Sequence, residues 1–356
     1  MTRSRLLMVV LVALFAGTGL VVPPATATGY AANPTNPLAG RPWGVYTGKS
    51  DGVYPAYQNA TGANRALLAK VALRPRAIWF GPWTPSGQIA AKIADYVAKT
   101  QRGNPEVVVP LAVFRLWPYS ESGKNRPLTS ADLAGYRAWI DQLARGIGGS
   151  RVAIVLEPDL AVALGGWRPA VRMALTSYAA KVLGGLPHAA VYLDASDSDW
   201  LSVEKAATTL RSAGVRYVRG FALGATHYSG VAPNIDYGTR IVAALAQAGL
   251  PGKHFVIDTA DNGRPFTWSQ YWAKHPAGDF DNAEPCRTLT EVRCDTLGIP
   301  PTWRVGDPAW GLGTQQTARA KRHVDGYLWF GRPWLVRQSS PFSLARTLQV
   351  AATTPY

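Results

Sequence analysis

Short apolar runs alternate with amphipathic stretches along most of the chain. Seven runs have the composition of buried strands, and they occupy residues 77–80, 107–113, 152–156, 189–194, 217–222, 254–258 and 327–330. Between them, apolar residues recur three and four positions apart, which predicts helices over residues 86–100, 129–147, 168–183, 200–214 and 237–249. This alternation is typical of parallel strands joined by crossover helices. We therefore predict an α/β fold, a distorted barrel of about seven parallel strands in a single domain. A doubly wound sheet is the alternative, but no Gly-rich phosphate loop follows the first strands.

The N-terminal segment has the pattern of a secretory signal peptide. Arg3 and Arg5 precede an apolar run over residues 6–15, and Ala25-Thr26-Ala27 is a small-residue cleavage pattern. Gly17, Gly19, Pro23 and Pro24 end the apolar character soon after this run, which argues against a membrane anchor. No later segment is apolar for long enough to span a bilayer. We predict a signal peptide over 1–27, a short leader over 28–36 and the barrel domain over 37–356. The protein is then secreted and extracellular, with no membrane span after signal removal.

The net charge is strongly positive. Removal of Arg3 and Arg5 with the signal peptide lowers the formal charge from +15 to +13. An excess of positive charge indicates either that the protein acts near an anionic surface or polymer, or only that charge keeps it soluble. Lysines and arginines are scattered and no nucleic-acid motif is present. We expect no nucleic-acid partner and a monomeric protein.

Cys286 and Cys294 are the two cysteines of the chain. An exported chain meets an oxidising compartment, so these residues are predicted to form a disulfide. A zinc site would need more ligands than this region offers, since His275 is the one histidine nearby. We expect neither a metal nor another cofactor.

Polar residues follow the predicted strands at the end where barrel active sites lie. The run 152–156 leads into Glu157 and Asp159, and the run 189–194 ends in Asp194. Other strand ends carry acids, aromatics and arginines, the composition of a sugar-binding cleft, in which aromatic faces stack on sugar rings and charged groups bind hydroxyls. Simpler roles are open: Asp159 as a helix N-cap, Asp194 as a partner of backbone N–H groups, Glu157 as a structural hydrogen-bonding group, and Asp258 as a loop cap.

Six segments in order resemble one family. They are "RAIWFG" (76–81), "IVLEPDLA" (154–161), "VYLDASDSDWL" (191–201), "RGFALGATHY" (219–228), "FVIDTADNG" (255–263) and "VDGYLWFGRP" (324–333). The chain resembles glycoside hydrolase family 6, the cellobiohydrolases and endoglucanases that cleave β-1,4-glucan with inversion. The resemblance implies a distorted barrel of parallel strands, usually counted as seven.

The resemblance also implies roles for individual residues. Asp159 corresponds to the general acid of the family, and Asp194 to a supporting carboxylate that lines the cleft. Trp79 and Trp200 correspond to platforms for sugar rings, although both could be plain core aromatics. The implied substrate-binding residues are Trp79, Trp200, Arg115, Arg332, Tyr228 and Asp258.

The chain departs from the family pattern where a second carboxylate is expected. Leu116 stands where the family has an aspartate that raises the pKa of the acid, and Arg337 falls at the proposed base aspartate. Inversion needs an acid and, across the sugar ring, a carboxylate that activates water. Three solutions are open. A carboxylate at Asp194, Asp197 or Asp261 replaces the base, or water loses its proton through a chain to a more distant group, or the protein binds glycans without cleaving them.

We predict a secreted, inverting glycoside hydrolase that acts on a β-1,4-glucan or related polysaccharide, with Asp159 as general acid. The alternative is a non-enzymatic carbohydrate-binding protein on the same fold. A third hypothesis, an enzyme for a charged glycan, is motivated by the basic charge and by the arginines at formerly acidic positions.

Overall fold

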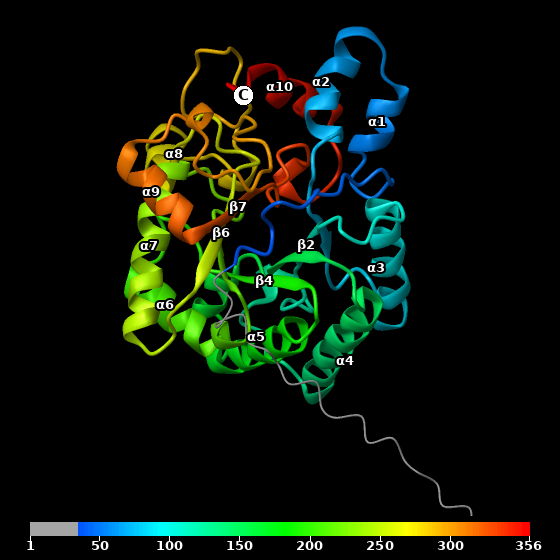
Figure 1. Cartoon of the computed structure of the whole chain (residues 1–356), viewed down its shortest axis with the longest axis vertical. Coiled ribbons are helices and arrows are strands. Elements are labelled where there is room, and N and C mark those ends of the chain that lie inside the picture. Colours follow the sequence, from blue (N-terminus) through cyan, green and yellow to red (C-terminus); the bar gives the residue numbers. More distant parts are fainter. Residues whose placement is uncertain (1–34) are drawn as a thin grey trace, which may run out of the picture.

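The computed structural model describes residues 35–356, so the predicted signal peptide lies outside the described residues. Seven strands form one sheet in the order β1 to β7, and each strand pairs in parallel with the next. The strands are β1 Ile78–Phe80, β2 Val109–Val113, β3 Val152–Leu156, β4 Ala189–Asp194, β5 Gly220–Leu223, β6 His254–Asp258 and β7 Val324–Leu328. Each strand lies beside the strand that precedes it in the chain, and the sheet is curled toward a barrel (Figure 1).

The edges of the curled sheet meet through a short backbone contact. The N–H of Ala77, just before β1, donates to the carbonyl of Trp329 at 2.8 Å, and a parallel bridge joins Arg76 to Trp329. The predicted distorted barrel of about seven parallel strands is thus confirmed. The last strand begins at Val324, three residues before the predicted start at 327. The charge of Asp325 made this segment look polar in sequence, but the side chain lies inside the barrel and is paired with Arg219.

Helices surround the sheet (Figure 1). They are α1 Val53–Asn59, α2 Gly62–Ala72, α3 Ser86–Gln101, α4 Ser130–Ile147, α5 Pro169–Gly184, α6 Val203–Ser212, α7 Val231–Gln247, α8 Trp268–Lys274, α9 Thr314–His323 and α10 Leu344–Thr353. Helices α3 to α7 correspond to the five predicted ones. Helices α1, α2 and α10 pack together next to Trp329 and were not predicted. Within residues 35–356, no helix combines the length and apolar character that a membrane crossing requires.

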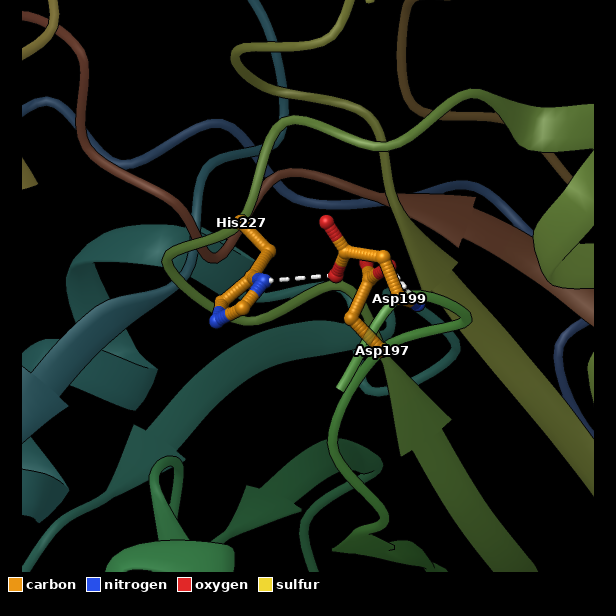
Figure 2. A group of neighbouring side chains, drawn as sticks. All are labelled: Asp197, Asp199 and His227. Carbon is orange, nitrogen blue, oxygen red and sulfur yellow. Dashed lines mark hydrogen bonds and ion pairs between the residues drawn. The ribbon is translucent and has the colours of Figure 1, made fainter. Parts of the chain in front are cut away.

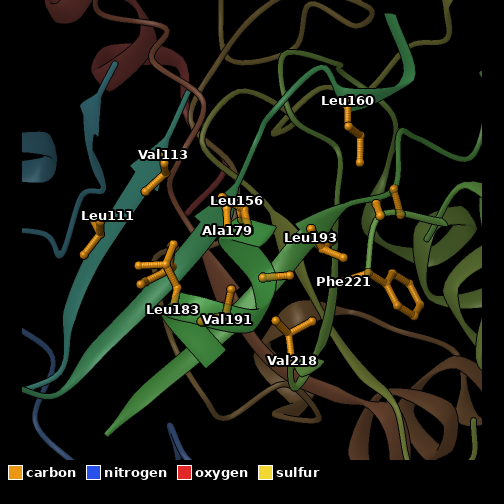
Figure 3. Packing of buried hydrophobic residues seen from close by; sticks show 14 of the residues in the cluster. Leu111, Val113, Leu156, Leu160, Ala179, Leu183, Val191, Leu193, Val218 and Phe221 are labelled. Carbon is orange, nitrogen blue, oxygen red and sulfur yellow. The ribbon is translucent and has the colours of Figure 1, made fainter. Parts of the chain in front are cut away.

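Both faces of the strands are buried, as expected for a parallel sheet covered by helices. In β3, Val152, Ile154 and Leu156 face the helices, whereas Ala153 and Val155 face the barrel interior. Leu183 of α5 belongs to the outer cluster (Figure 3). The inner face carries several alanines, which leaves room for aromatic and polar groups inside the curled sheet.

A buried ion pair crosses the barrel interior. Arg219 donates through Nε and Nη2 to the two oxygens of Asp325 at 2.8 and 2.9 Å. The hydroxyl of Tyr192 donates to the same carboxylate at 2.8 Å. The pair therefore ties β7 to the start of β5 and to the inward face of β4.

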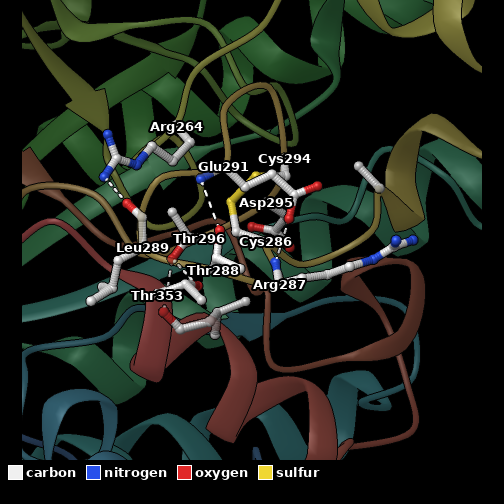
Figure 4. Close-up of a disulfide and its surroundings, with 12 residues drawn as sticks. Arg264, Cys286, Arg287, Thr288, Leu289, Glu291, Cys294, Asp295, Thr296 and Thr353 are labelled. Atoms are coloured by element: carbon white, nitrogen blue, oxygen red, sulfur yellow. Dashed lines mark hydrogen bonds between the residues drawn. A yellow bond between two sulfur atoms is a disulfide. The ribbon is translucent and has the colours of Figure 1, made fainter.

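The predicted disulfide between Cys286 and Cys294 is present (Figure 4). The two cysteines are separated by eight positions in the long connection between β6 and β7. Next to it, the Cys286 N–H donates to the Asp295 carbonyl at 2.9 Å, and the Asp295 N–H donates to the Glu284 carbonyl at 3.0 Å. The crosslink thus closes a short loop at the base of a hydrogen-bonded ladder.

Replacement of both cysteines by serine should lower the free energy of unfolding by about 2.5 kcal/mol, because the open loop regains entropy in the unfolded chain. Urea unfolding of the wild type and the double variant measures this difference. Addition of a reductant should lower the stability of the wild type only. A loss below about 0.5 kcal/mol would show that the loop is already ordered without the crosslink.

Candidate active site

A cleft of about 990 Å³ opens among the loops that follow the strands. Its walls carry aromatic and charged side chains from seven separate segments. The lining residues are Trp79, Pro82, Trp83, Phe114, Trp117, Pro118, Ser120, Glu121, Asp159, Val162, Asp199, Trp200, Thr226, His227, Trp268, Asp281, Arg332, Arg337, Gln338 and Ser339. In parallel barrels this end of the strands is where reactive groups gather.

Asp159 lies in the cleft at the end of a sharp turn after β3. Glu157 and Asp159 both have left-handed backbone conformations, with φ of 54° and 65°. The Asp159 side chain caps no helix, although the residue immediately precedes the 3₁₀ turn Leu160–Gly165. Instead the hydroxyl of Thr226 donates to Asp159 Oδ1 at 3.0 Å. Such strained turns cluster at functional sites, and this one turns the carboxyl group into the cleft.

The surroundings of Asp159 favour its protonated form. Burial, together with the negative charges of Glu121 and Asp281, raises the pKa of Asp159 from 3.8 to about 7. The Thr226 hydrogen bond and His227 act in the opposite direction. A carboxyl group with this pKa carries its proton at slightly acidic pH and can still release it, as a general acid requires.

Glu157 is a structural group. Its Oε2 accepts hydrogen bonds from the N–H groups of Arg115 (3.0 Å) and Leu116 (2.9 Å), and its Oε1 accepts one from the Tyr136 hydroxyl (2.6 Å). The side chain is fully buried and does not line the cleft. It fixes the loop after β2 to the turn that carries Asp159.

The three carboxylates considered as replacement bases are all buried. Asp194, Asp197 and Asp261 are each 1 % exposed or less, and none lines the cleft. Asp194 is close enough to Asp159 for their charges to interact, and burial and that charge raise the pKa of Asp194 well above its usual value. Asp261 accepts a hydrogen bond from Gln338 Nε2 at 2.9 Å. The structure thus places Asp194 behind Asp159, and Asp197 and Asp261 inside the walls.

Two cleft carboxylates were not foreseen from the sequence. Glu121 stands on the turn after β2, and Asp281 stands on the 3₁₀ turn Phe280–Asn282 between β6 and β7. Both line the cleft and are exposed to it. Their loops are long and irregular, so no strand-end pattern marks them. The sequence could have indicated them only as acidic residues in the connections that follow the carboxyl ends of strands.

Trp79 and Arg332 form a stacked pair in the floor of the cleft. The Arg332 guanidinium carbon lies 3.7 Å from the centre of the Trp79 ring, and Trp79 Nε1 donates to the Phe330 carbonyl at 2.7 Å. Burial lowers the pKa of Arg332 from its usual value to about 9, while the charges of Asp159 and Asp258 oppose this shift. Arg332 is therefore a cation held near the carboxyl group of Asp159, and it covers one face of the tryptophan.

A second aromatic stack also lines the cleft. The His227 ring lies parallel to Trp200, with centroids 5.0 Å apart, and to Trp268 at 6.3 Å. Trp83, Trp200 and Trp268 are 56 %, 39 % and 47 % exposed. Large aromatic faces left open in a cleft are suited to stacking on sugar rings.

The acids beside His227 could offer ligand atoms to a metal ion. One atom each from Asp197, Asp199 and His227 lies within 4.8 Å of the others. Figure 2 shows His227 Nδ1 facing Asp199, at 3.1 Å. Burial alone would lower the pKa of His227, but Asp199 and the nearby acids raise it. Asn234 Nδ2 donates to Asp197 Oδ2, and the Trp268 N–H donates to Asp199 Oδ2. Hydrogen bonds within the chain are therefore sufficient to explain why these three side chains lie together.

Three of the predicted substrate-binding residues lie outside the cleft lining. Tyr228 is fully buried and stacks on Phe266, with centroids 4.5 Å apart. Asp258 accepts hydrogen bonds from the N–H groups of Ala260 (2.9 Å) and Gly331, and so caps a loop. The Arg115 guanidinium lies over the Trp139 ring at 5.9 Å. The structure brings together Asp159, Trp79, Trp200 and Arg332, and places these three side chains behind the walls.

A second groove of about 1250 Å³ continues the cleft beyond the Trp79–Arg332 pair. Both cavities are lined by Trp79, Trp83 and Arg332. The groove also carries Lys49 and Lys92. The two cavities together form an elongated surface that suits a polymer better than a small molecule.

The fold and the cleft define an α/β-barrel protein of the kind whose active site lies at the carboxyl ends of its strands. The profile of Glycosyl hydrolases family 6 matches residues 44–333. This match covers most of the chain, which therefore belongs to glycosyl hydrolases family 6. The resemblance inferred from six sequence segments is confirmed.

Curated relatives and solved structures agree with this assignment. Endoglucanase A of Cellulomonas fimi is 35 % identical over 221 residues, which are 62 % of this chain and 47 % of that protein. Endoglucanase 1 of Streptomyces halstedii is 30 % identical over 206 residues, which are 57 % of this chain and 63 % of that protein. The chain thus spans from about half to just under two thirds of the length of these relatives.

Among solved structures, the endoglucanase Cel6 from Mycobacterium tuberculosis, in complex with methyl-cellobiosyl-4-deoxy-4-thio-β-D-cellobioside, superposes with a TM-score of 0.70 at 29 % identity. The superposition covers 89 % of this chain and 98 % of that one. Endoglucanase CEL6B from Humicola insolens superposes with a TM-score of 0.63 at 18 % identity, covering 89 % and 98 %, and supports the fold alone.

Proposed function

We propose that this protein is a secreted glycoside hydrolase that cleaves a β-1,4-glucan or related polysaccharide with inversion, with Asp159 as general acid. The observation that carries the proposal is the position of Asp159 in an elongated, tryptophan-lined cleft, where its pKa is raised to about 7. The similar M. tuberculosis protein is described as an endoglucanase in complex with a cellobiose-based thio-oligosaccharide, which supports a glucan as substrate.

The cleft residues then divide the work of the reaction. The protonated carboxyl group of Asp159 donates its proton to the glycosidic oxygen that leaves. The Thr226 hydroxyl and the nearby Arg332 cation stabilise the carboxylate that remains. Asp194, close behind Asp159, is the supporting carboxylate. Trp200, which is 39 % exposed, holds a flanking sugar unit. Trp79, 7 % exposed with one face under Arg332, offers a sugar only its remaining edge. Arg115, Tyr228 and Asp258 support the walls around them.

Export and domain organisation belong to the same proposal. The apolar run over residues 6–15 and the Ala25-Thr26-Ala27 pattern support removal of a signal peptide. The barrel domain over 37–356 contains the matched span and carries the disulfide, which suits an oxidising extracellular medium.

The function is tested by incubating the purified protein with soluble β-1,4-glucan and with oligosaccharides of increasing length, and by assaying new reducing ends. We expect release that requires β-1,4 linkages and that is faster on substrates long enough to occupy both cavities. Glycan binding without release at any pH between 4 and 8 would overturn the proposal and leave a carbohydrate-binding protein.

The pH dependence follows from the raised pKa of Asp159. The general acid must carry its proton, so kcat/KM should fall as the pH rises through about 7, where Asp159 becomes a carboxylate. Glu121→Gln removes one of the charges that raise this pKa and should move the alkaline limb to lower pH. Rates of reducing-end release from pH 4 to 9 measure both profiles. An alkaline limb that is identical in the two proteins would contradict the assignment.

A further inference from the structure

An inverting hydrolysis needs a second carboxylate, and the described part of the cleft offers few. Four carboxylates line it: Glu121, Asp159, Asp199 and Asp281. Asp159 is the acid, and Asp199 is held by His227 (3.1 Å) and by the Trp268 N–H (2.5 Å). Glu121 and Asp281 remain, and within residues 35–356 neither side chain has a hydrogen-bond or ion-pair partner.

The topology of the sheet separates these two candidates. Glu121 follows β2, the strand next to β3, which carries Asp159, so both stand on the same wall of the cleft. Asp281 lies in the connection after β6, three strands away from β3 in a curled sheet of seven. Its charge still reaches both Asp159 and Glu121, so its loop folds back over the same cleft. Because the acid and the base of an inverting hydrolase act on opposite faces of the sugar ring, this placement favours Asp281.

The turn that presents Asp281 is firmly anchored on both sides. Phe280 is buried and packs edge-on against Tyr228, with centroids 5.2 Å apart. Arg337 donates through Nε to Asp279 at 2.5 Å and through its backbone N–H to Asn282 Oδ1 at 3.2 Å. A reacting group must be held in place by its neighbours, and this turn meets that requirement. Arg337, at the position where the resemblance would put a base aspartate, thereby holds the turn that carries Asp281.

We infer that Asp281 is the catalytic base of this chain, a role that rests on the proposed glycoside hydrolase function. Water bound between Asp281 and the sugar attacks C1 while the bond from C1 to the leaving oxygen breaks. One proton of the water passes to the Asp281 carboxylate, and the proton of Asp159 passes to the leaving oxygen. Solvent exchange then returns Asp281 to the carboxylate and Asp159 to the acid. Desolvation and the charge of Asp279 raise the pKa of Asp281, which strengthens it as a base.

The test is rescue of Asp281→Ala by sodium azide. Azide attacks C1 without losing a proton, so it needs no base, and the shortened side chain leaves space for it. Hydrolysis of soluble β-glucan should fall about 10²–10⁴-fold in the variant. Azide should restore cleavage and yield an α-glycosyl azide, which is identified by NMR. Asp281→Asn, which keeps the shape of the side chain, should lose hydrolysis equally.

Matched variants separate the possible outcomes. Glu284→Ala removes an exposed carboxylate three residues away that does not line the cleft, and it should hydrolyse glucan as the wild type does. Full hydrolysis by Asp281→Ala, or azide rescue of Glu121→Ala in place of Asp281→Ala, would overturn the inference while leaving the proposed function intact. A wild type that is inactive on every glucan overturns the proposed function instead. Thermal unfolding confirms that each variant is folded.

Discussion

Replacement of Asp159 by asparagine should lower hydrolysis of β-1,4-glucan by about 10²–10⁴-fold, the usual contribution of a general acid. Asparagine keeps the size of the side chain and can still contact Thr226, but it has no proton to give to the leaving oxygen. The loss should therefore appear in kcat, with little change in KM. Initial rates of reducing-end release over a range of substrate concentrations separate the two constants.

The leaving group provides the control for this prediction. From 2,4-dinitrophenyl cellobioside the dinitrophenolate leaves without protonation, so Asp159→Asn should retain far more activity on this substrate than on glucan. Glu204→Gln makes the same carboxylate-to-amide change on the exposed face of α6 and should leave both activities unchanged. Equal losses on the activated glycoside and on glucan would show that Asp159 is needed for something other than proton donation.

Replacement of Asp325 by alanine should have the largest effect on stability, a loss of about 3–5 kcal/mol, because it leaves the Arg219 guanidinium buried without its carboxylate. Tyr192 also loses its acceptor on Asp325. The free energy of unfolding in urea measures the loss directly.

A double variant distinguishes a buried charge from simple loss of packing. Arg219→Met with Asp325→Leu removes both charges and keeps apolar volume, so it should be more stable than Asp325→Ala alone. Lys99→Ala, which breaks the exposed pair with Asp95 on α3, should change stability very little. An Asp325→Ala loss as small as that of Lys99→Ala would show that water or another group compensates Arg219.

The repeating elements of the fold could be predicted from the sequence because their burial is regular. Strands such as Val152–Leu156 are apolar throughout, and α4 shows its apolar face together with the capping box of Thr129 and Asp132. The last strand was misplaced because its Asp325 is polar and buried, a combination that only a partner distant in sequence explains. Helices α1, α2 and α10 were missed because they stabilise one another at the seam of the sheet.

The site was predictable only where it follows a strand directly. Asp159 comes three residues after β3, so the end of the strand fixes where this side chain lies. Glu121 and Asp281 lie in irregular connections whose path depends on contacts such as the one between Arg337 and Asp279. Asp197 and Asp261 were considered as cleft carboxylates from the sequence, but both side chains are buried in the walls. The neighbouring sequence does not distinguish an acid that faces the cleft from one that is buried in its wall.

We propose that this cleft hydrolyses a β-1,4-glucan by direct attack of water, with Asp159 as acid. The most direct test is the anomeric form of the first product, followed by proton NMR while cello-oligosaccharides are cleaved by the wild type and by Asp159→Asn. The wild type should first release the α-anomer, which then slowly equilibrates, and the variant should release almost none. Initial release of the β-anomer, or equal release by both proteins, would contradict it.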